Sequence, residues 1–236
     1  MAAGIAAGAP LASQGCVARG FEVAGASCAG IGHGLNEDRF RIFPGGFCVI
    51  DGIGRGKDGE VFAELAANRV QALLEGGASA SRALVEADRS LADLRRWVLG
   101  SGGGAMGCAC GTGSKGGLSV ACLGDVRAFL VGGEVCEVCR AESPTCDRGY
   151  LGAQEPRLPN ERELTRSELF SRVLMVCSDG FWRFAGAADL VRTLEKASSL
   201  ESAACRLVRL AQGCASTDDI TVVLCRPLTD SRQERI

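Results

Sequence analysis

The sequence of 236 residues contains a single histidine, His33, and has no long basic or apolar run. One histidine argues against a zinc site, which usually takes several histidine or cysteine ligands. It also argues against a mechanism that needs imidazole in several roles. With a net charge of −2, the chain lacks the basic surface that nucleic acid or an anionic membrane would require. No apolar stretch reaches the roughly 20 residues of a membrane-spanning helix.

The common nucleotide-binding loops are missing as well. The best candidate is CVIDGIGRGKDGE at residues 48–60. A Walker loop needs glycine five residues before Gly56 and a hydroxyl residue after Lys57, but Asp51 and Asp58 occupy these positions. The dinucleotide-binding pattern fails because Lys57 stands where the third glycine belongs. The nucleophile motif G-x-S-x-G is absent too. These absences make Asp51 itself the candidate functional group.

The thirteen cysteines do not form a recognisable framework. Their number is odd, and most lie inside apolar runs, where a reduced cysteine acts as a small core residue. Cys136 and Cys139 form a C-x-x-C pair in a segment that reads as a strand, so their side chains should point to opposite faces. Reduced thiols indicate a cytoplasmic protein.

Apolar runs and helical periodicity predict an α+β fold in one domain. Six runs are typical of buried strands, and a seventh strand, RFRIF, follows residue 38. Helices are expected at 58–75 and 81–99, and a second helical pair lies between 177 and 220. We therefore expect a four-layer α-β-β-α sandwich, with two antiparallel sheets face to face and helix pairs outside. The runs are residues 47–50, 105–110, 118–123, 127–131, 173–177 and 220–225.

The two ends of the chain read differently from the rest. Residues 1–20 are rich in alanine and glycine, and residues 228–236 are polar. Both compositions are typical of flexible tails. The folded domain is therefore expected to span residues 21–227.

Acidic residues recur where predicted strands begin or end. Asp51 ends one strand, Asp125 and Asp179 follow two others, and Asp218 precedes the last; the pair Glu37-Asp38 stands ahead of RFRIF. A single aspartate of this kind commonly caps a turn. Several carboxylates brought together need cations, and oxygen ligands without imidazole favour Mg²⁺ or Mn²⁺. Two such ions lower the pKa of a bridging water and neutralise a phosphate, which is the chemistry of phosphoester hydrolysis.

Five segments, in order, resemble the metal-dependent serine/threonine protein phosphatases of type 2C in a compact bacterial form. They are GLNEDRF, VIDGIGRGKDGE, ACLGDVRAFLV, LMVCSDGFW and STDDITVVL, between about residues 25 and 226. The resemblance implies that Asp51 bridges two Mn²⁺ or Mg²⁺ ions and that Gly52 adds its carbonyl. It further implies that Asp179 and Asp218 complete the first metal site. Glu37 and Asp38 would support the second, and Asp125 with Asp179 would match a looser third.

The chain also departs from the family pattern. His33 stands where the family usually has an arginine that grips the substrate phosphate; this is either a drifted loop residue or an imidazolium in place of the guanidinium. The flap expected between Thr145 and Leu164 is nearly absent. Asp219 replaces an asparagine, and Val126 replaces a serine.

The resemblance implies a monomeric phosphatase that acts on phosphoserine and phosphothreonine in proteins and opposes a serine/threonine kinase in bacterial signalling. Its catalytic residues would be Asp51, Asp179 and His33. The alternative is a pseudophosphatase that binds phosphoproteins as a regulator, suggested by the missing arginine and flap. Retention of Asp51, Asp179 and Asp218 argues against it.

Overall fold

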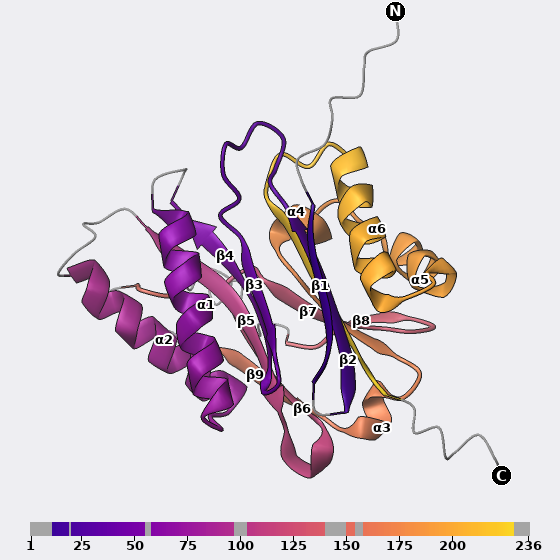
Figure 1. The fold of residues 1–236 in the computed structure, drawn as a ribbon, viewed down its shortest axis with the longest axis horizontal. Helices are drawn as coiled ribbons and strands as arrows, with labels where there is room; N and C mark the ends of the chain where they lie inside the picture. Colours follow the sequence, from indigo (N-terminus) through magenta and orange to yellow (C-terminus); the bar gives the residue numbers. More distant parts are fainter. Residues whose placement is uncertain are drawn as a thin grey trace, which may run out of the picture.

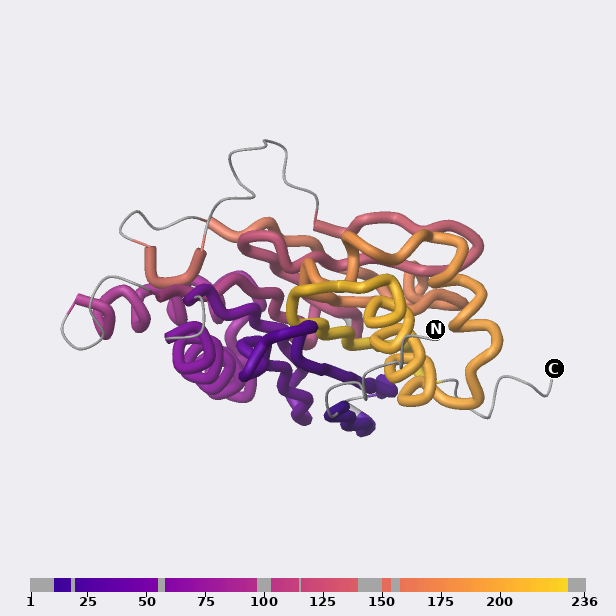
Figure 2. The backbone as a smooth tube through the Cα atoms, turned by 90° about the horizontal axis from the view of Figure 1, so that it is seen from above, coloured from indigo at the N-terminus to yellow at the C-terminus, as the bar shows by residue number. Residues whose placement is uncertain are grey.

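The computed structural model describes residues 11–18, 20–54, 58–96, 103–139, 150–153 and 158–228. Two antiparallel sheets lie face to face, with α1 and α2 outside one sheet and α5 and α6 outside the other (Figure 1). Figure 2 shows the same arrangement from above, with the two helix pairs on opposite sides of the strands. The α-β-β-α sandwich predicted from the sequence is confirmed.

The first sheet has the strand order β1-β2-β11-β10-β7-β8 and the second β3-β4-β5-β6-β9. The strands of the first sheet are β1 (Ala12–Ala18), β2 (Phe21–Cys28), β11 (Ile220–Pro227), β10 (Val173–Cys177), β7 (Arg127–Val131) and β8 (Val135–Glu137). Those of the second are β3 (Arg39–Phe43), β4 (Gly46–Ile53), β5 (Gly104–Thr112), β6 (Leu118–Leu123) and β9 (Asn160–Leu164). The helices are α1 (Gly59–Glu75), α2 (Ala80–Leu94), α3 (Arg166–Leu169), α4 (Asp179–Trp182), α5 (Ala187–Lys196) and α6 (Leu200–Gly213).

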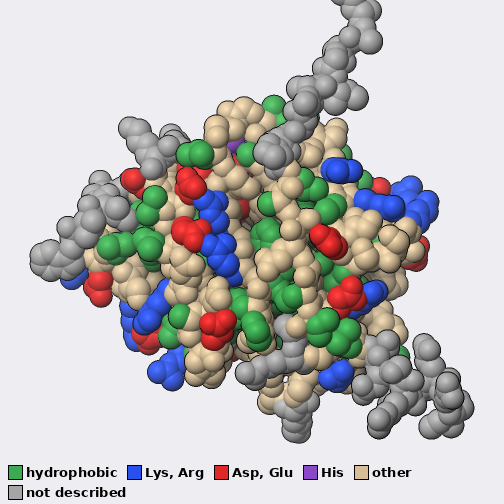
Figure 3. All heavy atoms as spheres, in the orientation of Figure 1, with side chains coloured by type: hydrophobic (Ala, Val, Ile, Leu, Met, Phe, Trp, Pro, Cys, Tyr) green, Lys and Arg blue, Asp and Glu red, His purple; other side chains and the backbone are tan. Residues whose placement is uncertain are grey.

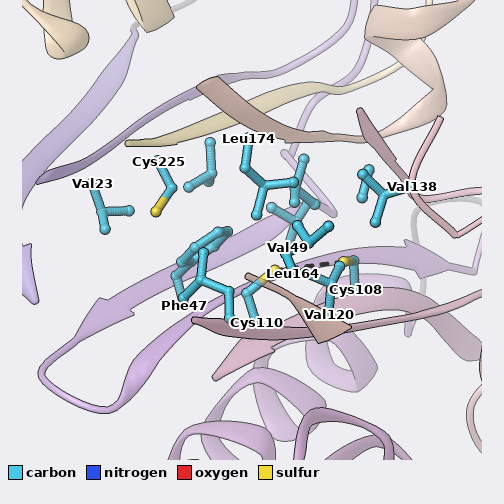
Figure 4. Packing of buried hydrophobic residues seen from close by; sticks show 14 of the residues in the cluster. Val23, Phe47, Val49, Cys108, Cys110, Val120, Val138, Leu164, Leu174 and Cys225 are labelled. Carbon is cyan, nitrogen blue, oxygen red and sulfur yellow. Dashed lines mark hydrogen bonds between the residues drawn. The ribbon is translucent and has the colours of Figure 1, made fainter. Parts of the chain in front are cut away.

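Three apolar layers hold the sandwich together. The central layer, between the sheets, contains Phe47, Val49, Val120 and Val223, together with several cysteines (Figure 4). A second layer packs α1 and α2 on one sheet, and a third packs α5 and α6 on the other. Alternation of side chains along each strand supplies both faces of each sheet with apolar groups.

The described cysteines are all free thiols, and most are buried. Cys136 on β8 is half-buried, whereas Cys139 is buried and its thiol approaches the carbonyl oxygen of Val120 at 3.5 Å. The two thiols of the C-x-x-C pair thus lie in different surroundings, but the predicted strand is shorter than expected, since β8 ends at Glu137 and Cys139 lies beyond it. In the described part of the chain, no helix is long and apolar enough to cross a bilayer.

The predicted N-terminal tail needs correction. Residues 12–18 form strand β1, which pairs along its whole length with β2. Its sequence, ASQGCVA, shows little apolar alternation because most of its side chains are exposed at the sheet edge. Backbone hydrogen bonds to β2 therefore form this strand without a hydrophobic pattern that the sequence could reveal. Residues 1–10, 19 and 229–236 lie outside the described residues.

The strand ends that carry acidic residues meet at one end of the sandwich. Arg39 pairs with Ile50 across β3 and β4, so Asp38 and Asp51 are neighbours at the same end of the second sheet. In the first sheet, Cys177 pairs with Val222 and with Arg127. This register brings the residues that follow β10 beside those that precede β11 and β7.

Candidate metal and phosphate site

Asp51 lies among four other carboxylates. The pKa of Asp51 is raised well above its usual range, first by burial and then by the negative charges of Asp38, Asp125, Asp179 and Asp218. These residues come from both sheets, and the sequence separates the first from the last by 180 positions. The aspartates predicted to act together are therefore brought together by the fold.

Asp38 is the most deeply enclosed of these acids. Its side chain is buried and accepts a hydrogen bond of 2.7 Å from the Ser178 hydroxyl. Burial raises its pKa to about 8, helped by the charges of Asp219 and Asp218 and opposed by hydrogen bonds from Thr221 and Ser178. Ser178 in turn accepts from the backbone N–H of Thr221 at 3.0 Å. The hydroxyl of Ser178 thus connects the acidic loop before β3 to β11.

Asp125 carries a buried oxygen that lacks a partner. Its Oδ1 atom has no hydrogen-bond partner among the described residues. Burial and the charge of Asp179 raise its pKa to about 6, while Arg183 acts in the opposite direction. A buried carboxylate oxygen without a donor is costly unless a cation or a proton satisfies it.

Gly52 and Gly180 are needed because other backbone atoms come very close. A Cβ on Gly52 would lie 2.4 Å from the carbonyl oxygen of Gly59 and 2.7 Å from that of Glu37. A Cβ on Gly180 would lie 2.1 Å from the carbonyl oxygen of Asp219. These contacts explain why glycine directly follows both Asp51 and Asp179 in the sequence. Any larger residue would push apart the segments that carry the acids.

Asp219 holds the loop that contains His33 and Glu37. Its carboxylate accepts backbone N–H groups from Gly30 at 2.7 Å and from Glu37 at 2.6 Å, and it contacts Nδ1 of His33 at 2.9 Å. Asp219 is buried. The sequence offered no reason for aspartate at this position; the structure gives one, because two carboxylate oxygens satisfy three donors of this loop.

His33 lies at the surface of the site. Its side chain is 40% exposed, and at the top of Figure 3 it reaches the surface at the end of the sandwich where the acids gather. When Nδ1 donates to Asp219, Nε2 is the ring nitrogen left to meet a substrate. The exposed Ile31 and Leu35 flank it on the same loop.

Arg39 attaches the acidic loop to helix α1. Its guanidinium donates to the carbonyl oxygens of Asn36 at 2.6 Å and Asp38 at 2.8 Å, and it forms ion pairs with Glu60 and Glu64. Glu60 belongs to the Asp-Gly segment VIDGIGRGKDGE. Through its ion pair with Arg39, it helps to position the acidic loop.

The sequence reasoning missed Arg183 and assigned no chemistry to Trp182. Arg183 lies 2.9 Å from Oδ2 of Asp179 and 3.8 Å from Oδ2 of Asp125. Trp182 donates its indole N–H to the backbone carbonyl of Asp125 at 2.8 Å. An i, i+4 spacing between Asp179 and Arg183 was the only available signal, and it requires knowing that a helical turn begins at Asp179.

The donor set suits Mg²⁺ or Mn²⁺, since all of the predicted ligands offer oxygen and Asp125 has an oxygen without a partner. Within the described ranges, no group of three or more acidic, histidine or cysteine side chains is arranged to hold an ion. The fit is one of donor chemistry and of converging charge, and binding would require side chains to turn toward the ion. Residues 55–57, 140–149 and 154–157 lie outside the described residues, and they include part of the segment predicted to carry a shortened flap.

Solved structures similar to this chain include bacterial serine/threonine phosphatases. The Mycobacterium tuberculosis phosphatase PstP/Ppp matches with a TM-score of 0.74 at 19% identity, over 89% of this chain and 99% of the other. The PstP catalytic domain in complex with two manganese ions matches with a TM-score of 0.75 at 20% identity, over 89% of this chain and 99% of the other. The S. agalactiae phosphatase gives 0.75 at 18% identity, over 88% and 99%. No family model and no curated relative matches the sequence. The chain has the fold of these phosphatases, as the resemblance predicted.

Proposed function

We propose that this protein is a metal-dependent phosphatase that hydrolyses phosphoserine and phosphothreonine in proteins. The observation that carries the proposal is the convergence of Asp38, Asp125, Asp179 and Asp218 on Asp51. A structural scaffold has no use for five carboxylates in one place, because their mutual repulsion and desolvation cost free energy. The fold shared with serine/threonine phosphatases supports the same reaction class.

The proposed ligands follow the positions described above. Asp51, the Gly52 carbonyl, Asp179 and Asp218 would hold one ion, while Asp51, Glu37 and Asp38 would serve a second. Bound divalent ions lower the pKa of a shared water, so that hydroxide is present near neutral pH, and they neutralise the phosphate.

His33 is proposed to contact the substrate through Nε2. Its imidazolium form can bind a phosphate oxygen and can give a proton to the leaving alkoxide, whereas an arginine in its place could only bind. Asp219 fixes the ring through Nδ1. The substrates are proposed to be phosphoproteins made by a cognate serine/threonine kinase in the cytoplasm, and the enzyme to act as a monomer.

The function is tested by hydrolysis of p-nitrophenyl phosphate and of a phosphothreonine peptide. Metal-stripped protein is assayed with Mn²⁺, Mg²⁺ or EDTA, beside an Asp179→Asn variant. Turnover that needs metal and is lost in the variant supports the proposal. Absence of turnover combined with tight binding of the phosphopeptide would replace it with a phosphoprotein-binding role.

The histidine predicts a particular dependence of activity on pH. An imidazole can lose its positive charge as pH rises, whereas a guanidinium keeps it, so binding of the phosphate should weaken as pH rises from about 6 to 8. We expect kcat/KM of the wild type to fall more steeply over this range than that of His33→Arg, which stays charged. Parallel profiles of the two proteins, measured with the same phosphopeptide, would show that His33 does not contact the phosphate.

A further inference from the structure

Arg183 occupies the space between two acids that were expected to share a metal ion. Its guanidinium is 2.9 Å from Oδ2 of Asp179 and 3.8 Å from Oδ2 of Asp125. These are the two residues that the sequence assigned to a third, looser ion. The side chains of Asp179 and Asp125 are 8% and 19% exposed, so water screens their negative charge poorly.

The neighbouring elements keep this cation and its two acids in place. The single turn of α4 puts Arg183 one helical turn after Asp179. The Trp182 indole N–H fixes the Asp125 backbone, and the guanidinium carbons of Arg127 and Arg183 lie 3.8 Å and 5.3 Å from the Trp182 ring centre. Distances under about 6 Å allow attraction between a cation and an aromatic face. Trp182, which directly precedes Arg183, therefore links helix α4 to the turn that carries Asp125.

We infer that the guanidinium of Arg183 takes the place of a third metal ion, so that this protein binds one divalent cation fewer than its carboxylates would otherwise allow. The inference depends on the proposed metal-dependent function in one respect, which is the number of ions that the other carboxylates bind. A hydrated divalent ion at Asp125 and Asp179 would meet a fixed positive charge within a few ångströms, and that repulsion opposes its binding. Oδ2 of Asp179, which contacts Arg183, is also unavailable to the ion, whereas Oδ1 of Asp125 keeps no hydrogen-bond partner among the described residues.

The guanidinium of Arg183 also affects the rest of the site. Oδ2 of Asp179 contacts Arg183, and the same carboxylate interacts with the backbone N–H of Gly180 and with the side chain of Asp218. Arg183 is half exposed, and it supplies a single positive charge that does not depend on the supply of metal. One of the two negative charges of the third site is then balanced at every metal concentration, whereas an exchangeable ion would act only above its dissociation constant.

Counting bound Mn²⁺ tests this inference without measuring activity. Equilibrium dialysis or titration calorimetry at pH 7.5 gives the number of ions per chain for the wild type and for Arg183→Met. The methionine keeps part of the apolar stem and removes the charge. The double variant Arg183→Met with Asp125→Asn removes the carboxylate that would receive the extra ion. Arg192→Met, which removes an exposed arginine of α5 paired with Asp189, is the matched control.

We expect Arg183→Met to bind one more ion than the wild type, and the double variant and the control to bind the wild-type number. If Arg183→Met does not fold by circular dichroism, Arg183→Gln removes the same charge with a polar side chain. An unchanged number of ions after either substitution overturns the inference, as would three ions in the wild type. If the wild type binds no ions and Arg183→Met binds one, the proposed function is refuted, but the inference about Arg183 is supported.

Discussion

Replacement of Asp51 by asparagine is expected to lower metal-dependent hydrolysis about 10³-fold and to raise the stability of the metal-free protein at pH 8. Asp51 is the proposed bridging ligand, and the loss of several kcal/mol of transition-state stabilisation from the metal centre corresponds to a rate loss of about this size. Asparagine has the same shape but no charge. It therefore removes the repulsion that Asp51 experiences from its four acidic neighbours.

The opposite signs of the two effects make the experiment informative. A residue retained for folding would lose stability when replaced, whereas a residue kept for metal binding is expected to cost stability while the metal is absent. Both quantities can be measured on one preparation, by initial rates with Mn²⁺ and by urea unfolding in EDTA.

Asp88 offers a matched control for Asp51. It is a buried aspartate of α2 that accepts the backbone N–H of Gly152 at 2.7 Å, and burial raises its pKa, opposed by Gly152 and Arg89. Asp88→Asn keeps an oxygen acceptor, so we expect activity close to that of the wild type. A loss of stability in Asp51→Asn, or a rate loss as large in Asp88→Asn, would show that the acidic cluster is structural.

The metal-free protein should become less stable as pH rises from about 5 to 8, and Mn²⁺ should reverse this trend. Burial raises the pKa of Asp38 to about 8 and that of Asp125 to about 6. Between their ordinary values, near 4, and these raised values, the folded state holds protons that the unfolded state has released. The free energy of unfolding therefore falls with rising pH, by about 1 kcal/mol per pH unit for each such group.

Differential scanning calorimetry in EDTA measures this effect. A change of about 1 kcal/mol moves the melting temperature of a domain of this size by roughly 2–4 °C. Addition of Mn²⁺ at pH 8 should raise it, because the ions bind the ionised carboxylates of the folded state only. A melting temperature that rises with pH in EDTA would mean that the carboxylates are already neutralised, for example by the arginines around them.

The sequence predicted the layers of the fold and the acids of the site because both produce recognisable local sequence patterns. Buried strands such as β4 and β10 are short apolar runs, and Asp51 and Asp179 stand at their ends with glycine directly after them. The strands β1 and β9 have no such apolar pattern. β9, with the sequence NEREL, is an edge strand with mostly exposed polar side chains, and its pairing with β6 forms it.

The contacts that organise the site depend on residues far apart in the sequence. Asp219 and His33 are 186 positions apart, and Ser178 and Asp38 are 140 apart. Neither pair follows a helical or strand period, so only the completed fold could show that Asp219 secures the loop with His33. The sequence did not reveal the role of Arg183 for a related reason. That role depends on contact with Asp125, which lies on a different turn of the chain.

The position of β11 determines when the site can exist during synthesis. This strand is the most C-terminal of those described, yet it lies between β2 and β10 inside its sheet, and Asp218 and Asp219 directly precede it. Until it leaves the ribosome, β2 and β10 lack the partner that joins them, and nothing clamps the backbone at Gly30 and Glu37. A nascent chain that still lacks β11 therefore has an incomplete acidic cluster, and the proposed activity would begin only after this strand is inserted.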